Sequence, residues 1–198
     1  MRIETSAGPA EIELDKPRKA AFLLLLTHGS GGGVDAKDLL TVRDTAVELG
    51  GAVARVTQPY RVAGRRAPGS AIKQDEAWLE IVADLHKRFT KIPLIQGGRS
   101  NGARVACRTA IAAEARGVIA LSFPLHPPGK PEKTRRDELL APGDIEVVVI
   151  NGASDPFGIP DPADAAEVRV IPGQPHSFRT GFDLIADTVT PWLERWTA

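Results

Sequence analysis

The sequence predicts an α/β protein, built as a doubly wound, mostly parallel sheet with helices on both faces. Short, nearly continuous apolar runs alternate along the chain with longer stretches whose apolar residues recur every three to four positions. A run that is apolar on both faces is typical of a strand buried in a parallel sheet, and the helical stretches supply the covering layers. The chain has 198 residues, 42% of them hydrophobic and 25% charged. These values are typical of one globular domain, which we expect to span residues 1–198.

Six apolar runs are the candidate strands of the parallel sheet. They cover residues 20–27, 52–57, 93–96, 117–122, 146–150 and 167–171, and residues 11–14 are a weaker candidate for an antiparallel strand. The intervening patterns predict helices over residues 38–49, 75–89, 101–115, 132–140 and 177–196. Gly50 is expected to end the first of these helices, and Pro191 to kink or shorten the last.

Charge and composition exclude several classes of function. The 25 Lys and Arg residues balance the 25 Asp and Glu residues, so the chain has no general attraction to nucleic acid or to an anionic membrane. A single cysteine, Cys107, cannot form an internal disulfide. Neither a secretory leader nor an apolar run of the roughly 20 residues that span a bilayer is evident. We therefore expect a soluble, cytoplasmic protein that acts on a small molecule, without nucleic-acid or membrane partners.

A candidate nucleophile follows the third predicted strand. In open α/β sheets, ligands bind beyond the carboxyl ends of the strands, so the loops at those ends carry the candidate chemistry. Residues 98–102 read Gly-Arg-Ser-Asn-Gly, which matches the pattern G-x-S-x-G in the strand–turn–helix context that it requires. The start of the next helix favours developing negative charge. Ser100 is therefore the candidate nucleophile, and a tight turn without chemistry is the alternative interpretation.

A glycine-rich loop, His-Gly-Ser-Gly-Gly-Gly at residues 28–33, follows the first predicted strand. It lacks the Lys-Ser/Thr ending of a P-loop and the spacing of a dinucleotide fingerprint, although a nucleotide-binding loop remains an alternative. In an H-G-x-G loop, one backbone N–H contributes to an oxyanion hole, and the residue after the nucleophile contributes another. These donors would be Ser30 and Asn101. His28 itself is expected to be a buried residue that holds the loop.

A serine nucleophile needs a base, and the base needs an orienting carboxylate. Of the four histidines, His176 alone lies after the last predicted strand and just before the last predicted helix. Asp155 is the first acidic residue beyond the predicted strand at residues 146–150. The order Ser100, Asp155, His176 is that of α/β-hydrolases. The alternative is that Asp155 only forms a turn and that His176 is a loop residue hydrogen-bonded to the backbone.

With these motifs in place, the chain resembles the α/β-hydrolases, and among them the compact dienelactone-hydrolase-like group. That group includes many bacterial hydrolases and is related to testis-expressed proteins and to subunits of chromatin complexes. The matching stretches run almost end to end: LTHGSGGG (26–33), QPYRVAGRRAP (58–68), GGRSNGARVA (97–106), SFPLHPPGKPEKTR (122–135), NGASDPFG (151–158) and GQPHSF (173–178). Dienelactone hydrolases use a cysteine nucleophile where this chain has Ser100, so dienelactone chemistry does not carry over. Because some relatives act as subunits, a non-catalytic interaction module is the alternative to an enzyme.

The expected activity is hydrolysis of a carboxylic ester or thioester through an acyl-enzyme on Ser100. His176 would act as general base and then acid, and Asp155 would orient it. No metal is expected, because no two histidines or carboxylates share a ligand-like spacing on one element. No cofactor is expected either. Lids of this fold usually lie within the interval that is here 123–145. It holds one short helix pattern and two proline-rich stretches, so we expect an open, shallow site without a large lid, with His126 at its rim.

Three arginines are candidate substrate-binding residues. Arg61, Arg65 and Arg66 follow the strand 52–57, which places them at the same edge of the sheet as Ser100. Guanidinium groups bind carboxylates and phosphates with two hydrogen bonds, so these residues would bind an anionic group of the substrate. Ion pairing with nearby Asp or Glu is the alternative.

Overall fold

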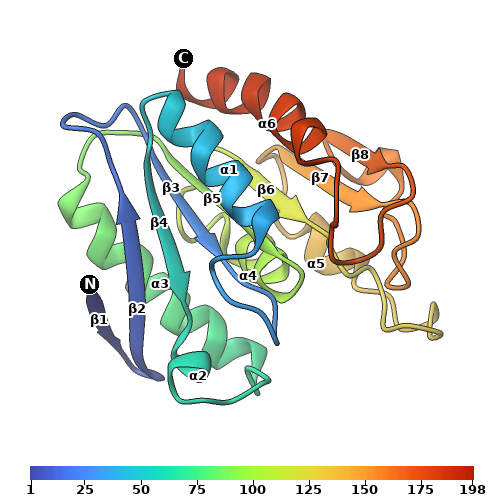
Figure 1. Cartoon of the computed structure of the whole chain (residues 1–198). Coiled ribbons are helices and arrows are strands. Elements are labelled where there is room, and N and C mark those ends of the chain that lie inside the picture. Colours follow the sequence, from blue (N-terminus) through green and yellow to red (C-terminus); the bar gives the residue numbers. More distant parts are fainter.

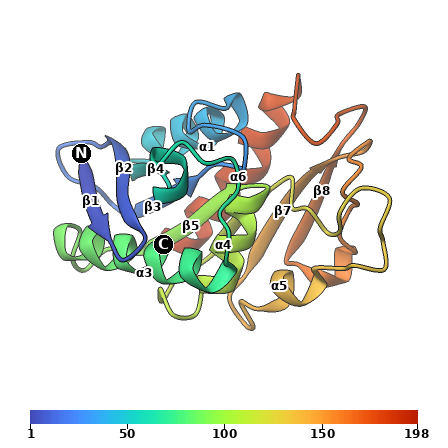
Figure 2. The ribbon, with the colours of Figure 1, turned by 90° about the horizontal axis from the view of Figure 1, so that it is seen from below.

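The computed structural model describes residues 1–198 and contains one eight-stranded sheet in the order β1-β2-β4-β3-β5-β6-β7-β8 (Figures 1 and 2). Strands β1 and β2 pair antiparallel, β2 pairs antiparallel with β4, and every pairing from β4 to β8 is parallel. The predicted fold class, a mostly parallel doubly wound sheet, is confirmed. The strands are β1 (Arg2–Thr5), β2 (Gly8–Asp15), β3 (Leu23–Thr27), β4 (Ala52–Thr57), β5 (Leu94–Arg99), β6 (Val118–Leu121), β7 (Val147–Gly152) and β8 (Glu167–Ile171).

Helices cover both faces of the sheet. On one face α1 (Lys37–Glu48) packs beside α6 (Phe182–Thr197), and on the other α3 (Ala71–Arg88), α4 (Asn101–Thr109) and α5 (Arg136–Leu140) follow one another (Figure 1). A short helix, α2 (Pro59–Val62), follows β4, and a single 3₁₀ turn, η1 (Pro162–Asp164), precedes β8. None of the helices combines the length and the apolarity that a bilayer span needs.

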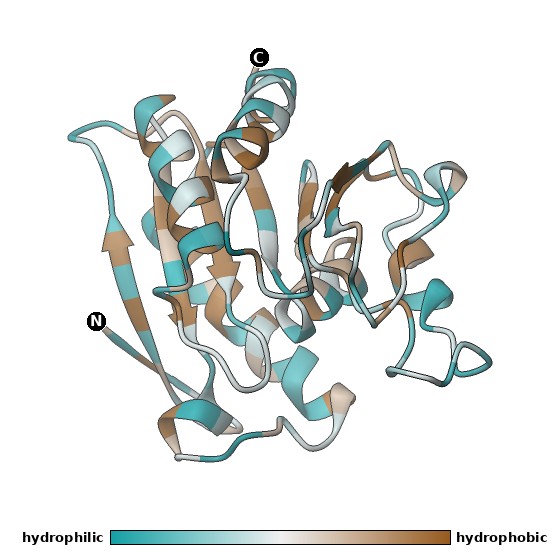
Figure 3. Cartoon of the chain, turned by 45° about the vertical axis from the view of Figure 1, so that its right-hand side comes forward, coloured by the Kyte–Doolittle hydropathy of each residue, from teal (hydrophilic) through white to brown (hydrophobic).

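The central strands divide the core into layers. Successive side chains of a strand point to opposite faces. Leu24 and Leu26 of β3 therefore pack with α1 and α6, whereas Leu23 and Leu25 pack with Trp78 of α3. Figure 3 shows the hydrophobic colour concentrated on these central strands, with alternating bands along β2, which is half exposed. Burial on both faces explains why the sequence of β3 is a continuous apolar run.

Several element boundaries differ from the sequence-based expectation. The hairpin strand β1 was not expected, because it has only four residues and buries one of them. Helix α3 begins at Ala71, where Ser70 caps it through the Lys73 N–H. Helix α4 ends at Thr109 rather than near residue 115. Helix α6 begins at Phe182 because Gly181 has φ +77°, and it continues through Pro191.

The parallel part of the sheet brings several loops to one edge. Parallel strands end on the same side, so the segments after β3, β5, β6, β7 and β8 meet there, and the segment after β4 starts at the same edge. The β5 strand runs three residues further than expected, to Arg99, because Gly97 and Gly98 continue the ladder with β6. Residue 100 therefore lies directly at the carboxyl edge of the sheet.

Candidate active site

Ser100 occupies a strained turn between β5 and α4. Its φ of 53° and ψ of −113° lie in a region that costs a non-glycine residue of order 1–3 kcal/mol. A Cβ at Gly98 would lie 2.6 Å from the carbonyl carbon of Gly102, and a Cβ at Gly102 would lie 2.5 Å from the carbonyl oxygen of Thr27. Both contacts are with backbone that cannot move aside. These contacts account physically for the two glycines that flank Ser100 at a distance of two residues.

Ser100, His176 and Asp155 form a continuous chain of hydrogen bonds. His176 Nε2 lies 2.9 Å from Ser100 Oγ, and His176 Nδ1 lies 2.8 Å from Asp155 Oδ2. The side chain of Asp155 is fully buried and that of His176 is 17% exposed. A neutral imidazole whose Nδ1–H donates to Asp155 leaves Nε2 free to accept the serine proton. The structure thus brings together the three residues that the sequence singled out, each from the loop after its own strand.

Phe157 and Asn151 hold Asp155 in place. The Phe157 N–H donates to Asp155 Oδ1 at 2.9 Å, and the Phe157 ring packs on the His176 ring with centroids 4.2 Å apart. Asn151, at the end of β7, is fully buried. Its side chain accepts from the Phe123 N–H and donates to the carbonyls of Phe123 and Gly158. The amide therefore joins the loop after β6 to the loop that carries Asp155, a role that no pattern in the sequence indicates.

Arg99 holds the His176 loop from the other side. Its Nη2 donates to the carbonyl oxygen of His176 at 3.1 Å and to Ser177 Oγ. Its Nε lies 2.9 Å from Oδ2 of the buried Asp38 in α1, as an ion pair. Burial raises the pKa of Asp38, and the Arg99 charge opposes that shift. The sequence does not indicate this pair, because 61 positions of chain separate two residues that meet only across the sheet edge.

A polar pocket of about 480 Å³ opens beside Ser100. Its lining residues lie at or after the ends of β3, β5, β6, β7 and β8: Gly29, Ser30, Gly31, Gly32, Arg99, Ser100, Asn101, Arg104, Pro124, Arg135, Phe157, His176 and Ser177. The backbone N–H groups of Ser30 and Asn101 have no acceptor within the chain. The side-chain Nδ2 of Asn101 is buried and also lacks a partner. Two residues that line the pocket thus carry backbone donors without internal partners. No group of three or more His, Cys, Asp or Glu side chains that could hold a metal ion is present.

His28 has a structural environment. It is fully buried, its Nε2 accepts the Gln58 N–H at 3.0 Å, and its Nδ1 lies 2.8 Å from the carbonyl oxygen of Gly29. Burial lowers the pKa of His28, which keeps the ring neutral. The ring therefore joins the glycine-rich loop to the start of α2, as expected for a residue that holds the loop.

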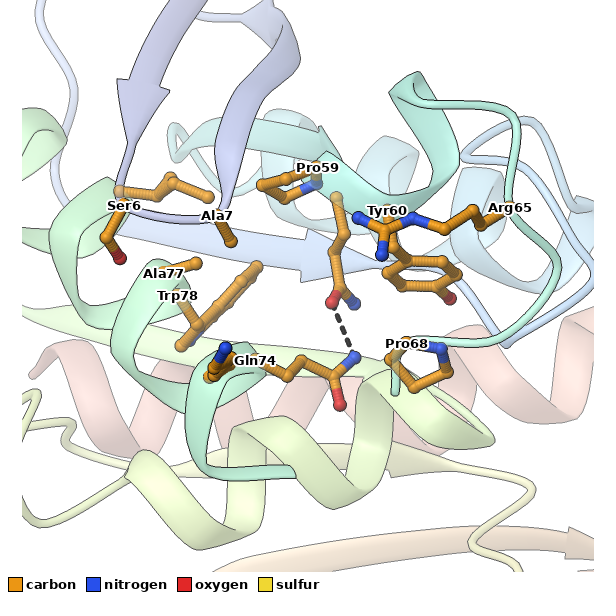
Figure 4. Close-up of a pocket in the computed structure, with 12 residues that line it drawn as sticks. Ser6, Ala7, Pro59, Tyr60, Arg65, Pro68, Gln74, Ala77 and Trp78 are labelled. Carbon is orange, nitrogen blue, oxygen red and sulfur yellow. Dashed lines mark hydrogen bonds between the residues drawn. The ribbon is translucent and has the colours of Figure 1, made fainter. Parts of the chain in front are cut away.

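The arginines after β4 do not join Ser100. None of Arg61, Arg65 and Arg66 lines its pocket, and none forms an ion pair. Arg65 instead borders a second cavity of about 230 Å³ between α2 and α3, where it lies near Tyr60 and opposite Trp78 (Figure 4). The segment after β4 does begin at the same edge of the sheet as Ser100. The short helix α2 then turns the chain towards α3, so these arginine side chains do not reach the serine.

His126 also lies outside the lining of the Ser100 pocket. Its Nδ1 lies 2.9 Å from the carbonyl oxygen of Pro127, and its ring packs so close to Gly158 that a Cβ there would approach Nε2 to 2.5 Å. Pro124 is the residue of this segment that reaches the pocket, together with Arg135 further on. Arg104 and Arg135 were not among the residues predicted for the site, although the position of Arg104, one helical turn after Ser100, is a signal in the sequence.

Comparisons with known proteins identify the family and the fold. A family model described as an alpha/beta hydrolase domain matches residues 20–181. Est1E from Butyrivibrio proteoclasticus, solved with ferulic acid bound, is similar at 18% identity, with 99% of this chain and 98% of that chain covered and a TM-score of 0.75. XC6422 from Xanthomonas campestris, described as a serine hydrolase without a lid, is similar at 18% identity, with 99% and 93% coverage and a TM-score of 0.73.

A dienelactone hydrolase from Anabaena variabilis is similar at 15% identity, with 98% of this chain and 95% of that chain covered and a TM-score of 0.75. At these identities the solved structures show a shared fold. No curated protein matches the chain. The family model spans more than half of the 198 residues, and the chain therefore belongs to the family of alpha/beta hydrolase domains.

Proposed function

We propose that this protein is a serine hydrolase that cleaves a carboxylic ester or thioester of a small soluble substrate through an acyl-enzyme on Ser100. The observation that carries the proposal is the hydrogen-bonded chain from Ser100 through His176 to Asp155, with distances of 2.9 and 2.8 Å. Membership of a hydrolase family supports the general activity. The intact serine and its base favour catalysis over a purely structural role.

Acyl transfer would proceed in two halves. Ser100 Oγ attacks the substrate carbonyl carbon while its proton passes to His176 Nε2, and the buried Asp155 carboxylate stabilises the resulting imidazolium. The bond from the carbonyl carbon to the leaving oxygen or sulfur then breaks, and His176 returns the proton to form the alcohol or thiol. Water, deprotonated by His176, attacks the acyl-enzyme in the second half. A carboxylic acid leaves and Ser100 regains its proton.

The negative charge of each tetrahedral intermediate would be stabilised by the N–H groups of Ser30 and Asn101. Both lie at the Ser100 pocket without an internal acceptor, and Asn101 begins α4, whose N-terminal dipole favours an anion. Loss of one such donor typically lowers kcat by about 10²–10³-fold. The glycines after Ser30 leave the loop backbone open to a substrate oxygen.

The shape of the pocket favours short, polar substrates. Phe157 and Pro124 are the only lining residues with sizeable apolar side chains, and one five-residue helix, α5, lies between β6 and β7. XC6422, which shares the fold, is described as lacking a lid, and Est1E was solved with a carboxylic acid, ferulic acid, bound. We infer that the site has no large lid, and we expect no rise in rate when a long-chain ester passes its solubility limit.

Activity-based labelling tests the proposal. The wild-type protein should react covalently with a fluorophosphonate and hydrolyse p-nitrophenyl acetate. Ser100→Ala, His176→Ala and Asp155→Asn should each lower kcat by roughly 10⁴-fold with unchanged far-UV circular dichroism. Ser6→Ala, an exposed serine in the β1–β2 turn, is the matched control and should behave as wild type. Labelling or turnover that survives Ser100→Ala would rule out the assignment.

A further inference from the structure

The Ser100 pocket is positively charged although the whole chain has no net charge. Three arginines line it, Arg99, Arg104 and Arg135, and no aspartate or glutamate does. A cation at a pocket wall attracts an anionic ligand only when a carboxylate of the protein does not already occupy it. Whether the pocket favours anionic ligands therefore depends on which of these arginines already pair with a carboxylate.

Two of the three arginines already have carboxylate partners. Arg99 lies 2.9 Å from Asp38. Arg104 donates to both oxygens of Glu138, at 2.8 and 2.6 Å. Glu138 also accepts from Arg108 Nη1 at 2.7 Å, so both of its oxygens are occupied. Arg108 has a second carboxylate partner in Asp75.

Arg135 has no carboxylate partner. Its only side-chain hydrogen bond is from Nη1 to the carbonyl oxygen of Pro124, at 2.9 Å, and no ion pair involves it. Burial and the neighbouring Arg104 charge lower the pKa of Arg135, and the Glu138 charge raises it in part, while the arginine remains protonated. A half-buried guanidinium, fixed by one carbonyl, thus faces the pocket with its remaining donors free.

We propose that Arg135 binds a carboxylate of the substrate, so that the preferred substrates are esters or thioesters that carry a negative charge close to the scissile bond. This inference rests on the proposed hydrolase function and names its substrate class. A planar guanidinium accepts a carboxylate with two parallel hydrogen bonds, which are among the stronger ones in proteins. Arg135 and Ser100 line one pocket of about 480 Å³, so one small molecule reaches both.

Matched ester pairs test the inference. Monomethyl succinate and dimethyl succinate differ only in a free carboxylate on the acyl side, and acetoxyacetate and its methyl ester differ in the same way on the alcohol side. The wild-type kcat/KM should be at least about tenfold higher for the anionic member of at least one pair. Raising NaCl from about 50 to about 500 mM should reduce that ratio, because salt screens the attraction.

Variants assign the preference to Arg135. Arg135→Gln should lower the anionic-to-neutral ratio of kcat/KM by at least about tenfold. Arg135→Lys keeps the charge but not the paired N–H donors of the guanidinium, so it should retain part of the preference for the anionic ester. Arg116→Gln is the matched control: it removes the same charge from an exposed, unpaired side chain at the opposite end of β6. It should leave the ratio at the wild-type value. Circular dichroism confirms that each variant is folded.

Substitution of Glu138 should change the anionic-to-neutral ratio of kcat/KM in the opposite direction. Its carboxylate competes for Arg104, so Glu138→Gln should increase the anionic-to-neutral ratio. A ratio that is the same in folded Arg135→Gln as in the wild type overturns the inference. A ratio that falls equally in Arg116→Gln also overturns it, because the effect would then be general electrostatics.

Binding without turnover separates the two proposals. Ser100→Ala should bind monomethyl succinate or acetoxyacetate more tightly than the matching neutral ester by calorimetry, and Arg135→Gln in that background should remove the difference. If this binding is found while the wild type hydrolyses no ester, the hydrolase proposal fails and the anion site stands. If Ser100-dependent hydrolysis is found without any Arg135-dependent preference, the hydrolase stands and the anion site fails.

Discussion

The backbone strain at Ser100 predicts that replacing the serine with glycine stabilises the fold relative to replacing it with alanine. Ser100 has φ +53° and ψ −113°, a conformation that glycine adopts readily and other residues do not. Ser100→Gly and Ser100→Ala both lose the hydrogen bond to His176. The difference between them therefore isolates the backbone strain from the chemistry of the hydroxyl.

The expected difference follows from two opposing contributions. Relief of the strain favours glycine by about 1–3 kcal/mol. The greater freedom of glycine in the unfolded chain opposes it by about 0.5–1 kcal/mol. The serine is only partly buried, so the lost methylene leaves no closed cavity. Ser100→Gly should thus exceed Ser100→Ala in free energy of unfolding by about 1 kcal/mol, within limits of about 0 and 2.5 kcal/mol. For a chain of 198 residues, each kcal/mol corresponds to a Tm shift of about 2–4 °C.

Urea unfolding followed by tryptophan fluorescence measures this difference, because Trp78 and Trp196 are buried in the native core. Ala83→Gly is the control at an exposed position within α3. There the conformation is ordinary, and glycine should destabilise by about 1 kcal/mol. If Ser100→Gly is less stable than Ser100→Ala, the turn is not strained in the way its dihedral angles indicate. Neither Ser100 variant should hydrolyse an ester.

Two further predictions concern titratable groups. Burial raises the pKa of Glu138, but hydrogen bonds and charges from Arg104 and Arg108 outweigh burial and hold it below its ordinary value of 4.5. Its stabilising contribution is therefore full above that value and lost as pH falls through the lower folded pKa, so the stability advantage of wild type over Glu138→Gln should shrink in acid. Cys107 is fully buried, and burial raises its pKa to about 12. A maleimide at pH about 8 should modify it only at the rate of unfolding, and quickly in urea. A stability difference between wild type and Glu138→Gln that does not change with pH would contradict the first prediction. Fast modification of Cys107 in the native protein would contradict the second.

The Ser100, Asp155 and His176 arrangement could be predicted because it depends on chain order alone. Each residue follows its own strand, and parallel strands end at one edge, so three separate loops converge without any knowledge of side-chain direction. The flanking glycines could be read in the same way, since Gly98 and Gly102 approach backbone rather than side chains. Backbone constraints of this kind are local, and they restrict the residue types at particular positions of the sequence.

The charged lining of the pocket could not be predicted from the same reasoning. Arg65 and Arg66 stand at the right edge of the sheet, yet α2 directs the segment towards α3 and away from Ser100. Arg135 lies in a long loop between β6 and α5, where no periodicity indicates a direction. Which arginines face the serine depends on loop geometry, which the pattern of residue types does not specify.

Charge balance explains why the anionic preference is invisible at the level of composition. The 25 basic and 25 acidic residues cancel over the whole chain, but cancellation at one pocket depends on which carboxylate each guanidinium reaches. Glu138 pairs with Arg104 and Arg108, whereas Arg135 has only the Pro124 carbonyl as a partner. Because the unpaired cation lies at the pocket wall rather than on open surface, water cannot fully screen it. A bound carboxylate would supply the missing partner, so the same ion-pair network that stabilises α4 and α5 also sets the charge that the substrate should carry.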